Sequence, residues 1–196
     1  MTPEIRSFEF ALGLFSVLIG LALADVAASF HRLMCVRPQV RWDPLVLLTA
    51  LLAMVITVGM WFDLWGIRNA TSVRHFFLYL ALVGAFFVLF LIAASSLPDE
   101  ATPGLDLREF YGRNRRYFWF LVTLFEFVYV AFGIHFIGPV MARLPNAVLV
   151  TLIGQWIVLL VVPAVLMLVR SRAMHYGGVA VFFVTVAWHY ANQVIT

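Results

Sequence analysis

Residues 115–137 read RRYFWFLVTLFEFVYVAFGIHFI, a stretch of 23 residues that begins with two arginines and is otherwise mostly apolar and aromatic. A helix rises 1.5 Å per residue, so this length crosses a hydrocarbon core of about 30 Å. Backbone groups left unpaired in hydrocarbon are costly, which favours helices over an open sheet. Five similar windows cover residues 8–30, 44–66, 75–96, 147–169 and 174–195. The sequence predicts an all-α, polytopic membrane protein: one domain over 1–196, a bundle of six transmembrane helices.

The composition supports the bilayer as the main partner. Hydrophobic residues make up 64% of the chain and charged residues 12%, whereas soluble domains carry about 25% charged residues. All thirteen basic residues are arginines, and they lie toward the helix ends. We therefore read the net charge of +3 as an interaction with headgroups and expect no nucleic acid. One cysteine excludes an internal disulfide, and no Cys/His spacing predicts a metal site or another cofactor.

Arginines also predict the orientation. The connections after the first, third and fifth spans hold nine of them, and the opposite side holds four. By the positive-inside rule, both termini are expected on the non-cytoplasmic side of a bacterial-type inner membrane. The interfacial loop 98–114 is the only long connection. Its second half, from Asp106, is expected to form a short interfacial helix that places Phe110, Tyr117 and Trp119 at headgroup level.

Glu126 is the twelfth residue of its span and therefore lies at the bilayer midplane. An acidic residue there costs about 2.5–3.5 kcal/mol to insert, so it is protonated, faces a watery cavity or holds a cation. Other spans carry polar residues at similar depth, and Tyr129 lies one turn along. A polar belt and ion pathway is predicted from Glu126, Gln155, Thr185, Ser16, Thr57 and Tyr129. The alternative is structural: a protonated glutamic acid that hydrogen-bonds to Gln155 or a threonine and helps the helices pack.

Two further sets of residues are candidates. Glu9, Asp63, His135 and His189 lie toward the non-cytoplasmic end, where acidic groups at an outer mouth raise the local cation concentration. They are equally explained as ordinary polar residues near helix ends. On the first span, small residues recur every four positions and predict close helix packing, within one chain or between copies of a homo-oligomer: Ser16, Gly20, Ala24 and Ala28. A narrow pore lined by these small side chains is the alternative.

Single residues give two more expectations. Asp25, about one turn inside the first span, is expected to pair with His31 or Arg32. Pro163 should kink the fifth span because proline lacks a backbone N–H.

The layout resembles a known family. Phe15-Ser16 in the first span, Trp61 in the second, Pro98 after the third and Tyr111-Gly112 before the fourth are similar to the small six-helix bacterial relatives of the lysosomal potassium channel. The resemblance implies a cation channel. Val17 stands where that family's Phe-Ser-Asp motif has its aspartate, and the arginine count places the N-terminus opposite to the family's.

The sequence is compatible with three functions. A cation or proton channel or transporter is favoured by Glu126. A non-catalytic membrane subunit or effector, packed against a partner complex and docked through 98–116, accounts for the same polar groups. A b-type haem protein would use His135 and His189 as axial ligands. No enzyme is expected, because nucleophile elbow, HExxH and phosphate-loop motifs are missing.

Overall fold

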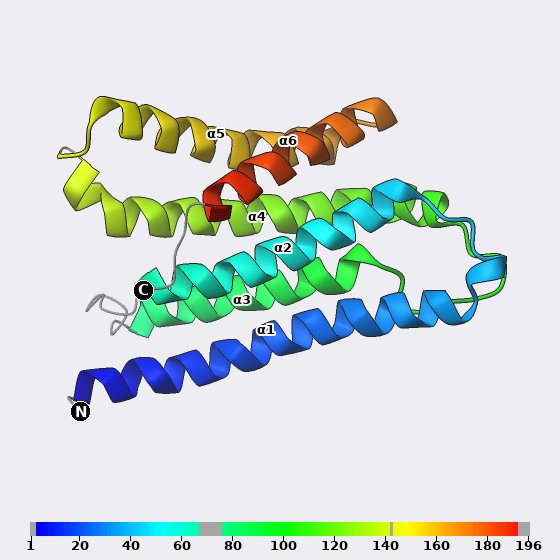
Figure 1. The fold of residues 1–196 in the computed structure, drawn as a ribbon, viewed down its shortest axis with the longest axis horizontal. Helices are drawn as coiled ribbons and strands as arrows, with labels where there is room; N and C mark the ends of the chain where they lie inside the picture. Colours follow the sequence, from blue (N-terminus) through cyan, green and yellow to red (C-terminus); the bar gives the residue numbers. More distant parts are fainter. Residues whose placement is uncertain (1–2, 67–75, 142, 192–196) are drawn as a thin grey trace.

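The chain folds into helices throughout the part that is described. The computed structural model describes residues 3–66, 76–141 and 143–191. These ranges hold six α-helices and one short 3-10 helix, with no β-strand (Figure 1). In chain order they are α1 (Pro3–Cys35), η1 (Arg37–Gln39), α2 (Pro44–Gly66), α3 (Phe76–Ser96), α4 (Leu107–Met141), α5 (Asn146–Leu168) and α6 (Arg172–Ala191). The all-α prediction with six helices is confirmed.

Five helices are long and apolar enough to cross a membrane, with the apolar stretches Leu12–Cys35, Pro44–Leu64, Phe76–Ser96, Leu107–Pro139 and Asn146–Leu168. The described part of α6 is not among them. It carries Arg172, two histidines and two tyrosines in 20 residues, and the last residues of the predicted span 174–195 lie outside the described ranges. The histidines and tyrosines of α6 therefore need polar partners on neighbouring helices.

The helices run alternately between two ends. We call the end that holds the α1–α2, α3–α4 and α5–α6 connections the loop end, and the opposite end the terminal end. α1 lies at one edge of the bundle and packs against α2 and α3 (Figure 1). α4 packs against both α3 and α5, and α6 packs against α2 and α5. Polar side chains of α6 can therefore meet those of α2 and α4 inside the bundle.

Many large apolar side chains lie on the surface of the bundle. Phe15 and Phe86 stack in the core with ring centroids 4.6 Å apart, and both are 1% exposed. Phe77 on α3 is 82% exposed and Val150 on α5 is 71% exposed. Soluble monomers rarely expose large contiguous apolar patches, so this surface is the one expected of a helix bundle surrounded by lipid.

Backbone hydrogen bonds join the two connections at the loop end. Arg41 N donates to Leu105 O over 2.9 Å, and Leu107 N donates to Arg41 O over 3.1 Å. Gly104 N reaches Gln39 O over 3.0 Å with a φ of 84°, which glycine adopts without strain. The two connections therefore hold the starts of α2 and α4 in register.

The predicted interfacial helix differs from what is observed. Asp106 caps a single continuous helix: its Oδ1 accepts from Arg108 N over 2.9 Å, and α4 then runs for 35 residues from Leu107. Because the helix starts early, Trp119 lies three turns inside it and is fully buried. Trp119 is therefore enclosed by protein and does not face headgroups directly, whereas Tyr117 is 48% exposed.

Candidate functional site

Glu126 lies in the interior of the bundle and faces a cavity. Its side chain is 3% exposed. The cavity has a volume of about 20 Å³, enough for one water molecule. Its lining comes from α2, α4, α5 and α6: Ile56, Phe125, Glu126, Tyr129, Leu159, Thr185, Val186, His189 and Tyr190. Among the described residues, none forms a hydrogen bond or ion pair with the Glu126 carboxyl, so the cavity is the one place where this group can find a polar partner.

A set of polar contacts continues from the cavity toward the terminal end. Tyr129 Oη and His189 Nε2 are 3.1 Å apart. His189 Nε2 lies 3.6 Å from Asp63 Oδ1, and Tyr190 donates from its hydroxyl to Asp63 Oδ2 over 2.8 Å. Titratable groups from α2, α4 and α6 thus form one connected cluster next to Glu126, which we call the terminal cluster: Asp63, Tyr129, His189 and Tyr190.

The predicted polar belt is present in part. Tyr129 and Thr185 line the cavity with Glu126, and Gln155 reaches the Thr185 backbone oxygen over 3.5 Å. Thr57 is buried, but its hydroxyl donates to Ala53 O of its own helix over 2.7 Å. Ser16 likewise donates to Leu12 O over 2.6 Å, on a helix that packs against α2 and α3. Neither Ser16 nor Thr57 lines the cavity beside Glu126, so their place in a pathway stays a prediction.

The structure brings together only some of the residues predicted for the outer mouth. Asp63 and His189 meet in the terminal cluster. His135 is exposed on α4, with its ring edge-on to Phe136 at 5.2 Å. The side chain of Glu9 lies outside the described residues. His189 lines the cavity and His135 does not, so the haem hypothesis gains no support from this arrangement.

The small-residue stripe and Asp25 both lie on α1. Gly20, Ala24 and Ala28 are exposed, and a Cβ added to Gly20 would meet nothing within 4 Å. The small-residue stripe therefore packs against no described part of its own chain, and packing between copies stays a prediction. Asp25 Oδ2 is buried and has no hydrogen-bond partner among the described residues, because Arg32 donates to Ser29 Oγ over 2.7 Å instead.

A second polar cluster lies at the loop end and was not predicted as a site. Trp119 Nε1 donates to Tyr111 Oη over 2.9 Å, and Tyr111 Oη lies 2.7 Å from His175 Nδ1. His175 Nε2 is 3.0 Å from Val169 O. A neutral His175 with its proton on Nε2 satisfies all three contacts: Trp119 donates to Tyr111, Tyr111 donates to His175, and His175 donates to the carbonyl.

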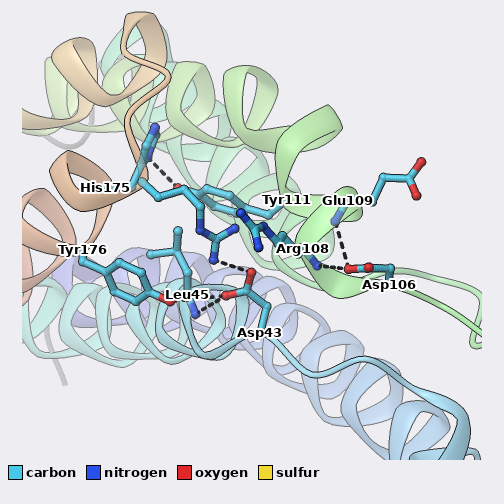
Figure 2. Close-up of polar contacts among 9 residues, drawn as sticks. Asp43, Leu45, Asp106, Arg108, Glu109, Tyr111, His175 and Tyr176 are labelled. Atoms are coloured by element: carbon cyan, nitrogen blue, oxygen red, sulfur yellow. Dashed lines mark hydrogen bonds and ion pairs between the residues drawn. The ribbon is translucent and has the colours of Figure 1, made fainter.

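Asp43 completes this loop-end cluster. It is 3% exposed and caps α2 by accepting from Leu45 N over 2.9 Å. Arg172 donates to Asp43 Oδ2 over 2.5 Å, and the Tyr176 hydroxyl donates to Asp43 Oδ1 over 3.5 Å. Figure 2 shows Asp43 beside Tyr176, and it shows the contact between Tyr111 and His175 as a dashed line. Arg115 Nη1 donates to Val169 O, beside His175. The loop-end cluster is defined as Asp43, Tyr111, Arg115, Trp119, Arg172, His175 and Tyr176.

An apolar layer separates the two clusters. Val122 on α4 and Phe182 on α6 are both fully buried, and Val179 is 2% exposed. These positions lie between Trp119 and Glu126 on α4, and between His175 and Val186 on α6. Side chains three and four residues apart share a helix face, so both helices turn the same face from one polar cluster to the other.

The sequence contained one signal for the loop-end cluster. Tyr111, Arg115 and Trp119 recur every four residues and continue to Glu126 seven residues later, which places them on one face of α4. The contacts from Asp43 and His175 have no such signal, because their partners lie 129 and 64 residues away in the chain.

Comparison with models of protein families, with curated proteins and with solved structures finds no match for this chain. The resemblance to relatives of the lysosomal potassium channel therefore stays a prediction.

Proposed function

We propose that this protein is an integral membrane protein that carries protons across the bilayer, with Glu126 as the group that binds them. One observation carries the proposal: a carboxyl group is almost completely buried, has no hydrogen-bond partner among the described residues, and faces a cavity of the size of one water molecule.

The energetics favour an exchangeable proton at this position. An ionised carboxylate is expensive to bury without a partner, and the group neutralises instead. Arginines at the loop end are too far along the helix to help: the nearest on α4, Arg116, is ten residues from Glu126, which is about 15 Å of helix. The proton on Glu126 is therefore the charge that compensates the carboxylate.

The size and lining of the cavity favour a proton over a larger cation. A cavity of about 20 Å³ has no room for a hydrated ion. In the described part of the chain, no group of three His, Cys, Asp or Glu side chains could hold a metal ion. The polar groups that do line the cavity, from Glu126, Tyr129 and His189, are all able to accept or donate a proton.

The terminal cluster supplies a route toward that end of the bundle. A water in the cavity would bridge Glu126 to the hydroxyl of Tyr129 and the ring of His189. His189 in turn lies 3.6 Å from the Asp63 carboxylate. A proton can pass along such a chain because each member is both donor and acceptor in one of its states, whereas an ion would need the side chains to separate.

The test is proton flux in reconstituted liposomes that hold a pH-sensitive dye. With a potassium gradient and valinomycin to set the voltage, we expect wild-type protein to acidify or alkalinise the lumen in the direction of the voltage. Glu126→Gln keeps the shape and removes the titratable group, and we expect it to abolish flux. Glu109→Gln is the matched control, because Glu109 is an exposed acid on the same helix whose contact is Arg113 at 3.9 Å.

Two results would contradict the proposal. Glu126→Gln liposomes that conduct like wild type would remove Glu126 from the pathway. Wild-type liposomes without flux, at several pH and ion gradients, would replace proton transport with the alternative of a non-catalytic membrane subunit. That alternative is favoured by the exposed stripe of Gly20, Ala24 and Ala28, a surface that lets another helix approach closely.

A further inference from the structure

The tip of the α5–α6 hairpin is bounded by residues that weaken helices. Pro163 on α5 removes one backbone hydrogen bond, and Gly177 and Gly178 follow each other on α6. We call residues 164–176 between these positions the hairpin tip. Within it, Leu166 packs directly on Gly178, where an added Cβ would lie 2.7 Å from Leu166 Cδ2. The two arms therefore touch at the hinge and are able to move as one unit.

Polar contacts fix the hairpin tip to two other helices. Arg172 and Tyr176 reach Asp43 at the start of α2. His175 is hydrogen-bonded to Tyr111 on α4. Arg115, also on α4, donates to Val169 O in the turn of the tip. Each polar group named here has a hydrogen-bond partner, so these contacts attach the tip to α2 and α4. Such contacts form or break together when the tip moves.

The hairpin tip covers the apolar layer from the loop end. His175 and Val179 lie one turn apart on the same face of α6, and both are almost fully buried. Beyond Val179 come Phe182 and then the cavity beside Glu126. In this conformation Glu126 connects to the terminal cluster, while the loop-end side is closed by the apolar layer and by the tip above it.

We propose that the hairpin tip is the gate at the loop end of the proton pathway, hinged at Pro163 and Gly177–Gly178 and held closed by the loop-end cluster. This inference rests on the proposed function for its purpose. The movement itself is a separate physical claim: breaking the Asp43 or Tyr111 contacts lets water reach the loop-end side of the apolar layer.

The test measures access to Val179. Val179→Cys is introduced in a Cys35→Ser background, since Cys35 is the single native cysteine and is exposed. The protein is placed in lipid nanodiscs, which leave both membrane faces open, and a membrane-impermeant methanethiosulfonate reagent is added. Asp43→Asn removes the charge but keeps a good helix cap, and Tyr111→Phe removes one hydroxyl. Arg41→Gln is the control, because it breaks an exposed 3.7 Å ion pair with Asp106 at the same end.

We expect slow labelling of Val179→Cys in the otherwise unchanged protein. Asp43→Asn and Tyr111→Phe should each raise the labelling rate about tenfold, which is the effect of weakening the closed state by one strong hydrogen bond. Arg41→Gln should leave it unchanged. The gate is contradicted if neither variant speeds labelling, if Arg41→Gln speeds it equally, or if Ala93→Cys, buried in α3, becomes reactive in the same variants and so indicates unfolding.

The labelling experiment and the flux experiment can fail separately. Faster labelling without any wild-type flux would confirm the hinged tip and contradict proton transport. Wild-type flux with unchanged labelling would keep proton transport and remove the tip as its gate.

Discussion

The terminal cluster depends on a glycine, and replacing that glycine is a demanding test of the geometry. Gly59 lies on α2 one turn before Asp63. A Cβ added there would lie 2.1 Å from Tyr190 Cε2 and 2.7 Å from its hydroxyl oxygen, whereas ordinary contact begins at 3.4 Å. Gly59→Ala therefore forces the ring back by about 1.3 Å, from 2.1 to 3.4 Å, and pulls it from its 2.8 Å bond to Asp63.

The cost can be estimated from its parts. Overpacking costs about 1–3 kcal/mol, and a lost hydrogen bond to a charged group costs about 1.5–3 kcal/mol. Alanine returns about 1 kcal/mol through its higher helix propensity. The free energy of unfolding should thus fall by about 1.5–5 kcal/mol. For a chain of this size Tm should fall by about 3–20 °C.

Thermal unfolding in detergent, followed by circular dichroism, measures this effect against a matched control. Gly84→Ala makes the same change on α3, where an added Cβ meets nothing within 4 Å, and should leave Tm unchanged or slightly higher. In a Tyr190→Val background the clash is gone, so Gly59→Ala should become harmless. Equal Tm changes for Gly59→Ala and Gly84→Ala, or the same Gly59→Ala cost in both backgrounds, would refute the contact between Gly59 and Tyr190.

Three further outcomes follow from the packing. Tyr111→Phe leaves an indole N–H and an imidazole nitrogen unpaired and should cost about 2–4 kcal/mol in urea unfolding; a neutral result would contradict the hydrogen-bond chain. Gly178→Ala should lower Tm through overpacking against Leu166 while Gly177→Ala should not, and equal effects would contradict the close approach. Arg41→Gln breaks an exposed ion pair and should change stability by less than about 1 kcal/mol; a larger loss in urea unfolding would show that this pair is structural.

The helices and the central acid could be predicted because their signals are local. Each apolar window is a property of about 20 consecutive residues. Glu126 is conspicuous because it interrupts such a window. Helix ends were harder to predict: α4 starts at Leu107 because Asp106 caps it and the 101–107 segment bonds to the α1–α2 connection. That early start carries Trp119 from the expected interface into the core.

Contacts between distant segments could not be predicted from local patterns. Asp43 and Arg172 are 129 residues apart, and each looks like an ordinary charge near a helix end. Ser16 is not beside the Glu126 cavity for a related reason: residue counts give an expected depth along a helix, but they do not say which helices are neighbours. The packing of α1 against α2 and α3 places Ser16 away from Glu126.

We expect Glu126 to hold a proton that exchanges through the adjacent cavity. Infrared spectroscopy of the protein in lipid measures this directly, through the carbonyl stretch of a protonated carboxylic acid. We predict a band in wild-type protein that shifts when the solvent is changed to D2O, disappears in Glu126→Gln and persists in Glu109→Gln. A band that is unchanged in Glu126→Gln, or that does not shift in D2O, would contradict the claim.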